Sequence, residues 1–306
     1  MRCVNSIQNQ TYSNLEIVLV NDGSTDDSGA QCDFLAETDS RIKVIHQNNR
    51  GVSAARNTAI EIITGDYVVF VDSDDYLGPN HIENLFSPFE VGSIQKNTVV
   101  ITGATEVLQN EILTDCCLEK SPKVFPLERD DALCELVQAD GRFASYAWGK
   151  LYSKELFDVL SFPIGRLYED QAIAYKVLLR ADYIYYEDAR DYYYVVNRQQ
   201  SISNASRLNR LDFLEAIRAM KNDPDLQNGS VKKVVFERYI ASLAESCMIS
   251  AKYCSRQQFG GYFSELVDQR KQVSNKHDLP VKVRGVLIIS HLGERLFRFV
   301  AKMIYR

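Results

Sequence analysis

The stretch DYVVFVDSDDYL, residues 66–77, decides the fold class of this chain. Its first six residues form an almost continuous apolar run, which is typical of a strand buried on both faces of a parallel sheet. The acidic residues Asp72, Asp74 and Asp75 follow at the carboxyl end of that strand. Ligands of open α/β sheets bind at the carboxyl ends of strands, so the acidic group is expected at a ligand site.

Strand and helix patterns alternate around this stretch through the first half of the chain. Strands are predicted at residues 15–20, 41–46, 66–71 and 98–103, and helices at 2–10, 26–37, 51–63 and 79–89. This alternation predicts an α/β fold: a mostly parallel sheet with helices on both faces, as in a Rossmann-like nucleotide-binding half. The helix at 2–10 has no strand before it, although every later helix in this half follows one.

The pattern loosens after residue 104 and then becomes helical. A hairpin or long loop is predicted at 111–126, helices at 128–138, 154–160 and 169–180, and aromatic strands at 183–187 and 191–196 with a charged turn between them. From residue 208 onward only helices are predicted, at 208–221, 231–253 and 257–272. The expected domains are therefore a sheet domain at 1–205, a helical region at 206–280 and a basic amphipathic tail helix at 281–306.

Composition excludes several functional classes. The 306 residues are 45% hydrophobic and 25% charged, a globular balance, and the net charge of −6 argues against a nucleic-acid partner. No apolar run approaches the ~20 residues of a spanning helix, and the first residues lack the apolar core of a secretory signal. Seven cysteines without a CxxC pair argue against a disulfide framework or a zinc site, and favour a cytoplasmic protein.

The acidic group after the strand at 66–71 suits a hard divalent cation. Carboxylates this close repel one another unless a cation neutralises them, and Mg²⁺ or Mn²⁺ binds one or two carboxylates together with substrate phosphates. The competing interpretation is a solvated acidic turn that precedes the next helix.

Four further charged residues are candidates for binding or proton transfer. Asp22 ends another strand and could accept hydrogen bonds from a base or ribose, whereas the neighbouring Ser and Thr residues are explained as a cap of the next helix. Arg56 is expected near the crevice, where a guanidinium fits phosphate, unless it is simply an exposed helix arginine. Glu169 and Asp170 stand in a first helical turn, where the macrodipole is expected to keep Asp170 ionised and ready to accept a proton.

The order of these groups resembles the family 2 glycosyltransferases of the GT-A fold, especially bacterial enzymes of capsule, exopolysaccharide and lipopolysaccharide synthesis. The resemblance is carried by CVNSIQNQTYSNLEIVLVNDGSTDDS (3–28), GVSAARNTAIEIITGDYVVFVDSDDYLGP (51–79), WGKLYSKELF (148–157) and YEDQ (168–171). It covers about two thirds of the chain and leaves the helices after residue 207 unmatched.

The resemblance implies a nucleotide-sugar site. Asp22 resembles the aspartate that binds the uracil of a UDP-sugar, and Arg56 a basic residue beside the nucleotide. Asp72 and Asp74 resemble the DxD motif, in which Asp74 would ligate Mn²⁺ or Mg²⁺ and Asp72 would hold the ribose or a metal-bound water. Arg198 could close over the diphosphate, or could be a solvated arginine at a strand end.

The resemblance also implies the reaction. Asp170 resembles the catalytic base, with Glu169 beside it, in a hexosyltransferase (EC 2.4) that inverts configuration by one displacement. The acceptor would be a hydroxyl of a glycan or of a lipid-linked sugar in bacterial surface polysaccharide synthesis. Trp148 and Lys150 could shape the acceptor site, although packing in the core also explains a lone Trp beside aromatic strands.

One departure from the family leaves alternatives open. The family usually begins with a further strand resembling VSVIIPVYN; its absence here is expected to reflect a misplaced start or a truncated gene, and to lower activity. A catalytically degenerate sugar-binding or scaffold remnant is therefore the first alternative to an enzyme. A nucleotidyltransferase is the second, although the chain lacks the glycine-rich basic loop typical of that class.

The last 26 residues carry six Lys and Arg against Glu294 alone. Apolar residues at helical spacing form one stripe of this segment: Ile288, Leu292, Leu296, Phe299 and Met303. A basic amphipathic helix predicts a peripheral enzyme at the inner face of the cytoplasmic membrane. The other interpretation is that the stripe packs on the preceding helices or on a second subunit in a homodimer.

Overall fold

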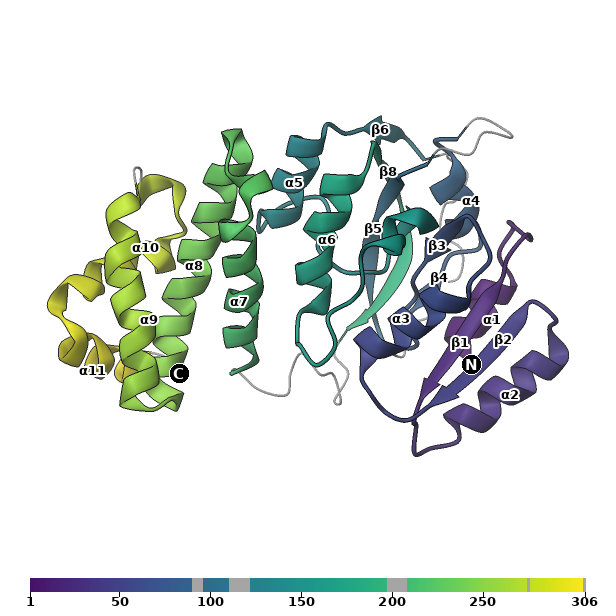
Figure 1. The fold of residues 1–306 in the computed structure, drawn as a ribbon, viewed down its shortest axis with the longest axis horizontal. Coiled ribbons are helices and arrows are strands. Elements are labelled where there is room, and N and C mark those ends of the chain that lie inside the picture. Colours follow the sequence, from purple (N-terminus) through teal and green to yellow (C-terminus); the bar gives the residue numbers. More distant parts are fainter. Residues whose placement is uncertain (90–95, 110–121, 197–207, 274–275, 305–306) are drawn as a thin grey trace. The chain divides into compact units, whose positions relative to one another are not determined.

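The computed structural model describes residues 1–89, 96–109, 122–196, 208–273 and 276–304 (Figure 1). The chain divides into two compact units, one of residues 1–136 and 140–199, the other of residues 137–139 and 200–306. The predicted boundary between residues 205 and 206 lies outside the described residues.

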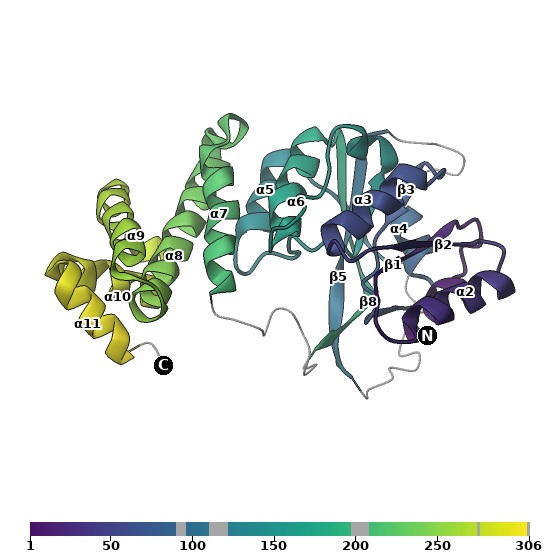
Figure 2. The same cartoon turned by 60° about the horizontal axis from the view of Figure 1, so that its bottom comes forward.

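The first unit contains a small parallel sheet of two strands. Strand β1 (Ile17–Asp22) pairs with β2 (Ile42–Gln47), and Ile17 lies opposite Ile42. Helices α1 (Arg2–Gln8) and α2 (Ser28–Thr38) pack on the face that carries Ile17 and Ile42. Figure 2 shows α3 (Val52–Ile62) and α2 on opposite sides of these strands. The expected coverage of both faces by helices therefore holds for this sheet.

The larger sheet of this unit has the strand order β3-β7-β5-β8-β4, with β6 paired to β8. Its strands are β3 (Tyr67–Val69), β4 (Tyr76–Leu77), β5 (Thr98–Leu108), β6 (Val124–Pro126), β7 (Lys150–Ser153) and β8 (Tyr183–Val196). The α/β class is confirmed, but in this sheet only the β5–β8 pair is parallel. The sheet is mixed because β7 lies between β3 and β5 and runs against both.

The aromatic segment forms one strand instead of the two predicted. Strand β8 continues across residues 188–190, of which Asp188 and Arg190 are exposed, and the charged residues that flank them, Glu187 and Asp191, are buried and bonded. Glu187 accepts a hydrogen bond from the Ala189 amide, and Asp191 accepts one from Asn84. A shift of register opposite Thr102 and Ala104 marks a β-bulge in the β5–β8 pair.

The remaining helices of this unit are α4 (His81–Phe86), α5 (Arg129–Val137) and α6 (Glu169–Arg180). Helices α5 and α6 lie side by side in both views (Figures 1 and 2). The segment predicted as a helix at 154–160 is a 3-10 helix over Lys154–Asp158.

The second unit is helical, as predicted. Its helices are α7 (Asn209–Asn222), α8 (Gly229–Tyr253), α9 (Arg256–Gln269), α10 (Val281–Ile289) and α11 (Glu294–Ile304). Helix α8 contacts each of the other four. None of the helices within the described ranges is long and apolar enough to cross a membrane.

The tail forms two helices, whereas the sequence predicts one. Gly293 has a φ of +82°, a backbone conformation that residues other than glycine rarely adopt, and it separates α10 from α11. Phe297 and Ala301 are buried, and the Phe297 ring packs against Phe259 and Phe263 of α9. Tertiary packing thus interrupts the helical periodicity of the sequence.

Candidate active site

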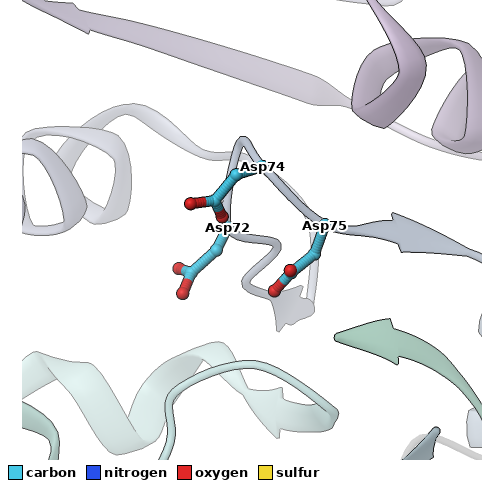
Figure 3. Close-up of side chains that lie close together, drawn as sticks. All are labelled: Asp72, Asp74 and Asp75. Carbon is cyan, nitrogen blue, oxygen red and sulfur yellow. The ribbon is translucent and has the colours of Figure 1, made fainter. Parts of the chain in front are cut away.

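The acidic group lies in the loop between β3 and β4. One carboxylate oxygen from each of Asp72, Asp74 and Asp75 can be chosen so that all lie within 4.8 Å of one another. Figure 3 shows the Asp72 and Asp74 side chains on the same side of the loop, while Asp75 leads into β4. Asp74 is exposed, Asp72 is partly exposed and Asp75 is buried.

Asp75 fixes this loop to the sheet. Its Oδ2 accepts a hydrogen bond from the Tyr192 hydroxyl at 2.8 Å, and its Oδ1 accepts one from the Val195 amide at 2.9 Å. The Tyr192 oxygen also accepts a hydrogen bond from the amide of Asp72. Desolvation raises the pKa of Asp75 to about 6. Asp72 and Asp74 are therefore the two members of the group whose carboxylates reach solvent.

Arg56 joins the acidic loop to helix α6. Its guanidinium donates to Oδ1 of Asp72 at 3.1 Å and to Oε1 of Glu169 at 2.9 Å, and lies 5.2 Å from the centre of the Phe162 ring. Its side chain is only 12% exposed, so the interpretation of Arg56 as an exposed helix arginine is wrong. Desolvation lowers the pKa of Arg56, but the carboxylates outweigh it and the net pKa is raised. This fork fixes the spacing of two carboxylates from distant segments.

Asn57, the next residue of α3, holds the segment before α6. Its side-chain amide donates to the Phe162 carbonyl at 2.9 Å, and its side-chain oxygen accepts from the Phe162 amide at 2.8 Å. Sequence reasoning missed this residue, although it stands inside the run GVSAARN. Asn57 therefore holds the Phe162 backbone, while Arg56 lies against the Phe162 ring.

Asp170 is half-buried in the first turn of α6. Desolvation, with a further contribution from the charge of Glu169, raises the pKa of Asp170 to about 6. Burial therefore dominates this pKa, and at about 6 the carboxyl group is mostly ionised at pH 7. Tyr168 precedes the helix with a φ of +58°, a strained conformation of the kind that clusters at functional sites.

Lys150 supplies a positive charge near Asp170. Desolvation lowers the pKa of Lys150 to about 7, against the opposing effect of the Asp170 charge. Its Nζ donates to the carbonyls of Ala144 at 2.9 Å and Tyr146 at 2.6 Å. Spacing alone could not show that this buried ammonium interacts electrostatically with a carboxylate 20 positions later in the chain.

Asp22 ends β1 and organises the loop after β2. Its Oδ1 accepts from Gln47 at 2.7 Å and from the Arg50 amide at 2.9 Å, and its Oδ2 accepts from the Gly51 amide at 2.7 Å. Desolvation opposes these hydrogen bonds, but they lower the pKa of Asp22 overall. An ionised carboxylate has about four acceptor positions, so Asp22 retains capacity for a ligand.

The structure therefore joins most of the predicted residues into one network and leaves others apart. Asp72, Arg56, Glu169 and Asp170 interact directly or electrostatically. Arg198 lies outside the described residues. The predicted Ser or Thr cap is wrong: α2 has Asp27 at its N-cap, without a capping side-chain hydrogen bond.

Comparisons with known proteins place part of the chain in a known family. Residues 1–115 match the family described as Glycosyl transferase family 2. The chain is 37% identical over 203 residues to Glycosyltransferase GlyA of Streptococcus pneumoniae serotype 4, and 32% identical over 201 residues to Putative glycosyltransferase EpsH of Bacillus subtilis. Each alignment covers 64% of this chain, and they cover 28% of GlyA and 56% of EpsH.

A further relative and one solved structure extend the comparison. Glycosyltransferase GlyG of Streptococcus pneumoniae is 35% identical over 202 residues, which are 63% of this chain and 65% of GlyG. The crystal structure of S. aureus TarS matches with a TM-score of 0.59 and 19% identity, over 100% of this chain and 52% of that one. The chain thus spans less than two thirds of each of these proteins. The motifs, the fold and these matches together show that the chain carries a glycosyl transferase family 2 domain, matched over residues 1–115, with a GT-A-like fold.

Proposed function

We propose that the chain transfers a sugar from a UDP-sugar to a hydroxyl of a glycan or lipid-linked acceptor, with inversion of configuration, in bacterial polysaccharide synthesis. The observation that carries this proposal is the double ion pair of Arg56, which holds Asp72 of the acidic loop and Glu169 of α6 in one site. A nucleotidyltransferase lacks support from the relatives, and the intact ion-pair network argues against a degenerate remnant.

The acidic loop suits a divalent cation. Asp74 and Asp72 would hold Mn²⁺ or Mg²⁺, because hard oxygen ligands match these ions and Asp75 is already committed to Tyr192 and Val195. A bound cation would neutralise the leaving diphosphate. The carboxylate of Asp22, at the end of β1, would accept a hydrogen bond from the uracil ring.

Asp170 is proposed as the base that takes the proton of the acceptor hydroxyl as that oxygen attacks the anomeric carbon. A pKa of about 6 leaves the carboxylate ionised at neutral pH, yet closer to the operating pH than an ordinary aspartate. Glu169, held by Arg56, positions the first turn of α6 and adds negative charge beside the base. Arg198 remains proposed as a contact to the diphosphate.

Released UDP from a panel of UDP-sugars, with Mn²⁺ and candidate acceptors, tests this proposal. Asp170→Asn should lower kcat by about 10²–10⁴-fold, the typical contribution of a positioned base. Asp74→Asn should weaken the binding of Mn²⁺, so a higher Mn²⁺ concentration should be needed for half-maximal turnover. Asp130→Asn is the matched control, since Asp130 is an exposed carboxylate in the first turn of α5. Full turnover by Asp170→Asn, or in excess chelator, would refute the assigned roles.

We further propose that the second unit binds the inner face of the cytoplasmic membrane. The stripe on α10 and α11 is exposed at Ile288, Leu292, Leu296, Phe299 and Met303, opposite the buried Phe297 and Ala301. The interpretation that this stripe packs on preceding helices therefore has no support. Arg295 and Lys302 are exposed at its flank, and each could attract anionic lipid by ~1 kcal/mol.

Not all of the predicted basic face is available to lipid. Arg298 donates to the carbonyls of Ala251 at 3.2 Å and Cys254 at 2.9 Å, and therefore fixes α11 to the end of α8. Ser290 is buried and accepts a hydrogen bond from Arg270. The membrane contact is thus assigned to the apolar stripe and its flanking cations, rather than to a free basic helix.

Flotation with phosphatidylglycerol vesicles tests the membrane contact. Phe299→Asp should abolish binding, and zwitterionic vesicles should bind the unaltered chain weakly. Val159→Asp is the control, because Val159 is an equally exposed apolar residue of the other unit. A different result would assign the stripe to a homodimer interface: the unaltered chain forms dimers and binds no vesicles, and Phe299→Asp dissociates those dimers.

A further inference from the structure

The first unit contains a pocket that none of the proposed donor or metal contacts uses. Its volume is about 620 Å³, and its lining residues are Ala104, Thr105, Glu106, Tyr146, Trp148, Arg190 and Tyr194. This volume falls within the range of about 300–1,000 Å³ typical of small-molecule sites. The lining comes from β5, from the segment before β7 and from β8, so rigid strands form most of the wall.

One side of the pocket is a stack of aromatic rings. The Tyr146 and Trp148 rings are 4.5 Å apart at an interplanar angle of 10°, and the Tyr194 ring lies 5.3 Å from Trp148 at 23°. Tyr146 is 41% exposed, so part of its ring remains available to a ligand. Flat aromatic surfaces of this kind bind the carbon-bound hydrogens on one face of a pyranose ring.

Charged groups lie among the lining residues beside these rings. Glu106 and Arg190 are both exposed and both line the pocket. Arg190 has a φ of +55° at the β-bulge of the β5–β8 pair, and bulges redirect side chains next to functional sites. Thr105 donates to the Arg190 carbonyl at 2.8 Å, and the Arg190 guanidinium donates to the Ala104 carbonyl at 3.1 Å. The strained backbone is therefore held by specific contacts.

Gly103 provides the space that this arrangement needs. A Cβ atom at position 103 would lie 3.1 Å from Cγ and 3.3 Å from Nε of Arg190. An alanine there would therefore push the Arg190 side chain away from its place across the bulge. The pocket thus has an aromatic surface for a sugar ring and two charged side chains, Glu106 and Arg190, for its hydroxyl groups.

Two chains of contacts connect this pocket to the proposed reaction centre. Trp148 stacks on Tyr192 at 4.5 Å, and the hydroxyl of Tyr192 is bonded to the acidic loop at Asp72 and Asp75. The Tyr146 carbonyl accepts a hydrogen bond from Lys150, whose charge acts on Asp170. The pocket wall is therefore connected, through Tyr192 and through Lys150, to the acidic loop and to the proposed base.

We propose that this pocket binds a pyranose ring of the acceptor, stacked on Tyr146 and Tyr194 and hydrogen-bonded through its hydroxyl groups to Glu106 and Arg190. The assignment of this saccharide as the acceptor rests on the proposed transfer reaction. A saccharide offers hydroxyl groups to the charged side chains of Glu106 and Arg190, which an apolar ligand would not, and the uracil of the donor is assigned to Asp22.

Trp148 offers a direct measurement, because it is the single tryptophan of the chain. The full chain is titrated with neutral, N-acetylated and uronic oligosaccharides while the fluorescence of Trp148 is recorded, and saturation-transfer NMR provides a second measurement. A saturable response is expected from at least one saccharide. Tyr146→Ala should weaken its affinity about tenfold, within the energy range of an aromatic contact, and Tyr146→Phe should retain it.

Variants separate the pocket from the reaction centre. Gly103→Ala and Arg190→Ala should each weaken saccharide binding, whereas the control Tyr183→Ala, at an exposed tyrosine of the same strand β8, should not. Asp170→Asn should lose transfer but keep saccharide binding, so failure of the proposed reaction would not be mistaken for failure of the pocket. Absence of any saturable saccharide response, or displacement of the saccharide by UDP alone in competition, would overturn the proposal.

Discussion

Replacement of Arg56 should destabilise the first unit more than replacement of any ordinary surface arginine. Arg56→Gln leaves the partly buried Asp72 and Glu169 without their cation. Removal of one partner from a buried ion pair costs about 3–5 kcal/mol. Because the Asp72 side chain is 36% exposed, water will compensate for part of this loss, and we expect about 3 kcal/mol.

Urea unfolding followed by Trp148 fluorescence measures this effect, since Trp148 belongs to the first unit. With a denaturant slope of about 2 kcal/mol per molar, a loss of about 3 kcal/mol moves the midpoint by roughly 1.5 M. Arg56→Lys should give an intermediate shift, because a single ammonium cannot reproduce the fork that contacts two carboxylates.

Arg142→Gln is the matched control. Arg142 also forms one ion pair, with Glu135 at 2.9 Å, and lies 4.9 Å from the centre of the Tyr186 ring, but its side chain is 39% exposed. Exposed pairs contribute about 0–1 kcal/mol. If Arg56→Gln shifts the midpoint no more than Arg142→Gln does, Arg56 does not hold the site together as argued.

Three further results are expected. Turnover should fall about tenfold per pH unit below pH 6, where Asp170 becomes protonated, and Glu169→Gln should move this limb to lower pH in the pH–rate profile, because Glu169 raises the pKa of Asp170. The urea midpoint of the first unit should rise when the pH is lowered from 7 to 5, because Asp75 has a pKa of about 6 in the folded state against its ordinary 3.8, and the folded chain therefore binds a proton before the unfolded chain does. Asp75→Asn should flatten that rise, and an unchanged rise in this variant would contradict the assignment to Asp75. Arg298→Gln should accelerate amide hydrogen exchange in α11 but not in α7. Equal exchange rates of α11 in the variant and in the unaltered chain would show that the hydrogen bonds of Arg298 to the end of α8 are dispensable.

Several errors in the sequence-based expectations share one physical cause. Residues 188–190 were expected as a turn between two aromatic strands, since isolated charges favour solvent. Asp188 and Arg190 are exposed, but β8 continues across them as far as Asp191, which is buried and bonded to His81 and Asn84 more than 100 positions earlier in the chain. The tail likewise shows a continuous amphipathic pattern, but burial of Phe297 against Phe259 and Phe263 of α9 and the turn at Gly293 divide it.

The sequence by itself determined the local elements and the position of the acidic loop. Period and composition act over a few residues, so the strand before Asp72, the helix of Arg56 and the helical second unit could be predicted from them. The motif resemblance likewise indicated the family that the comparisons show.

Only the tertiary structure decided what each side chain does. Arg56 contacts Glu169 across 113 positions of sequence, and Tyr192 contacts Asp75 across 117. No local pattern encodes such partners, because the fold alone brings these segments together. Burial follows from the same contacts: it commits Asp75 to the loop, raises the pKa of Asp170 to about 6 and leaves Asp74 at the surface.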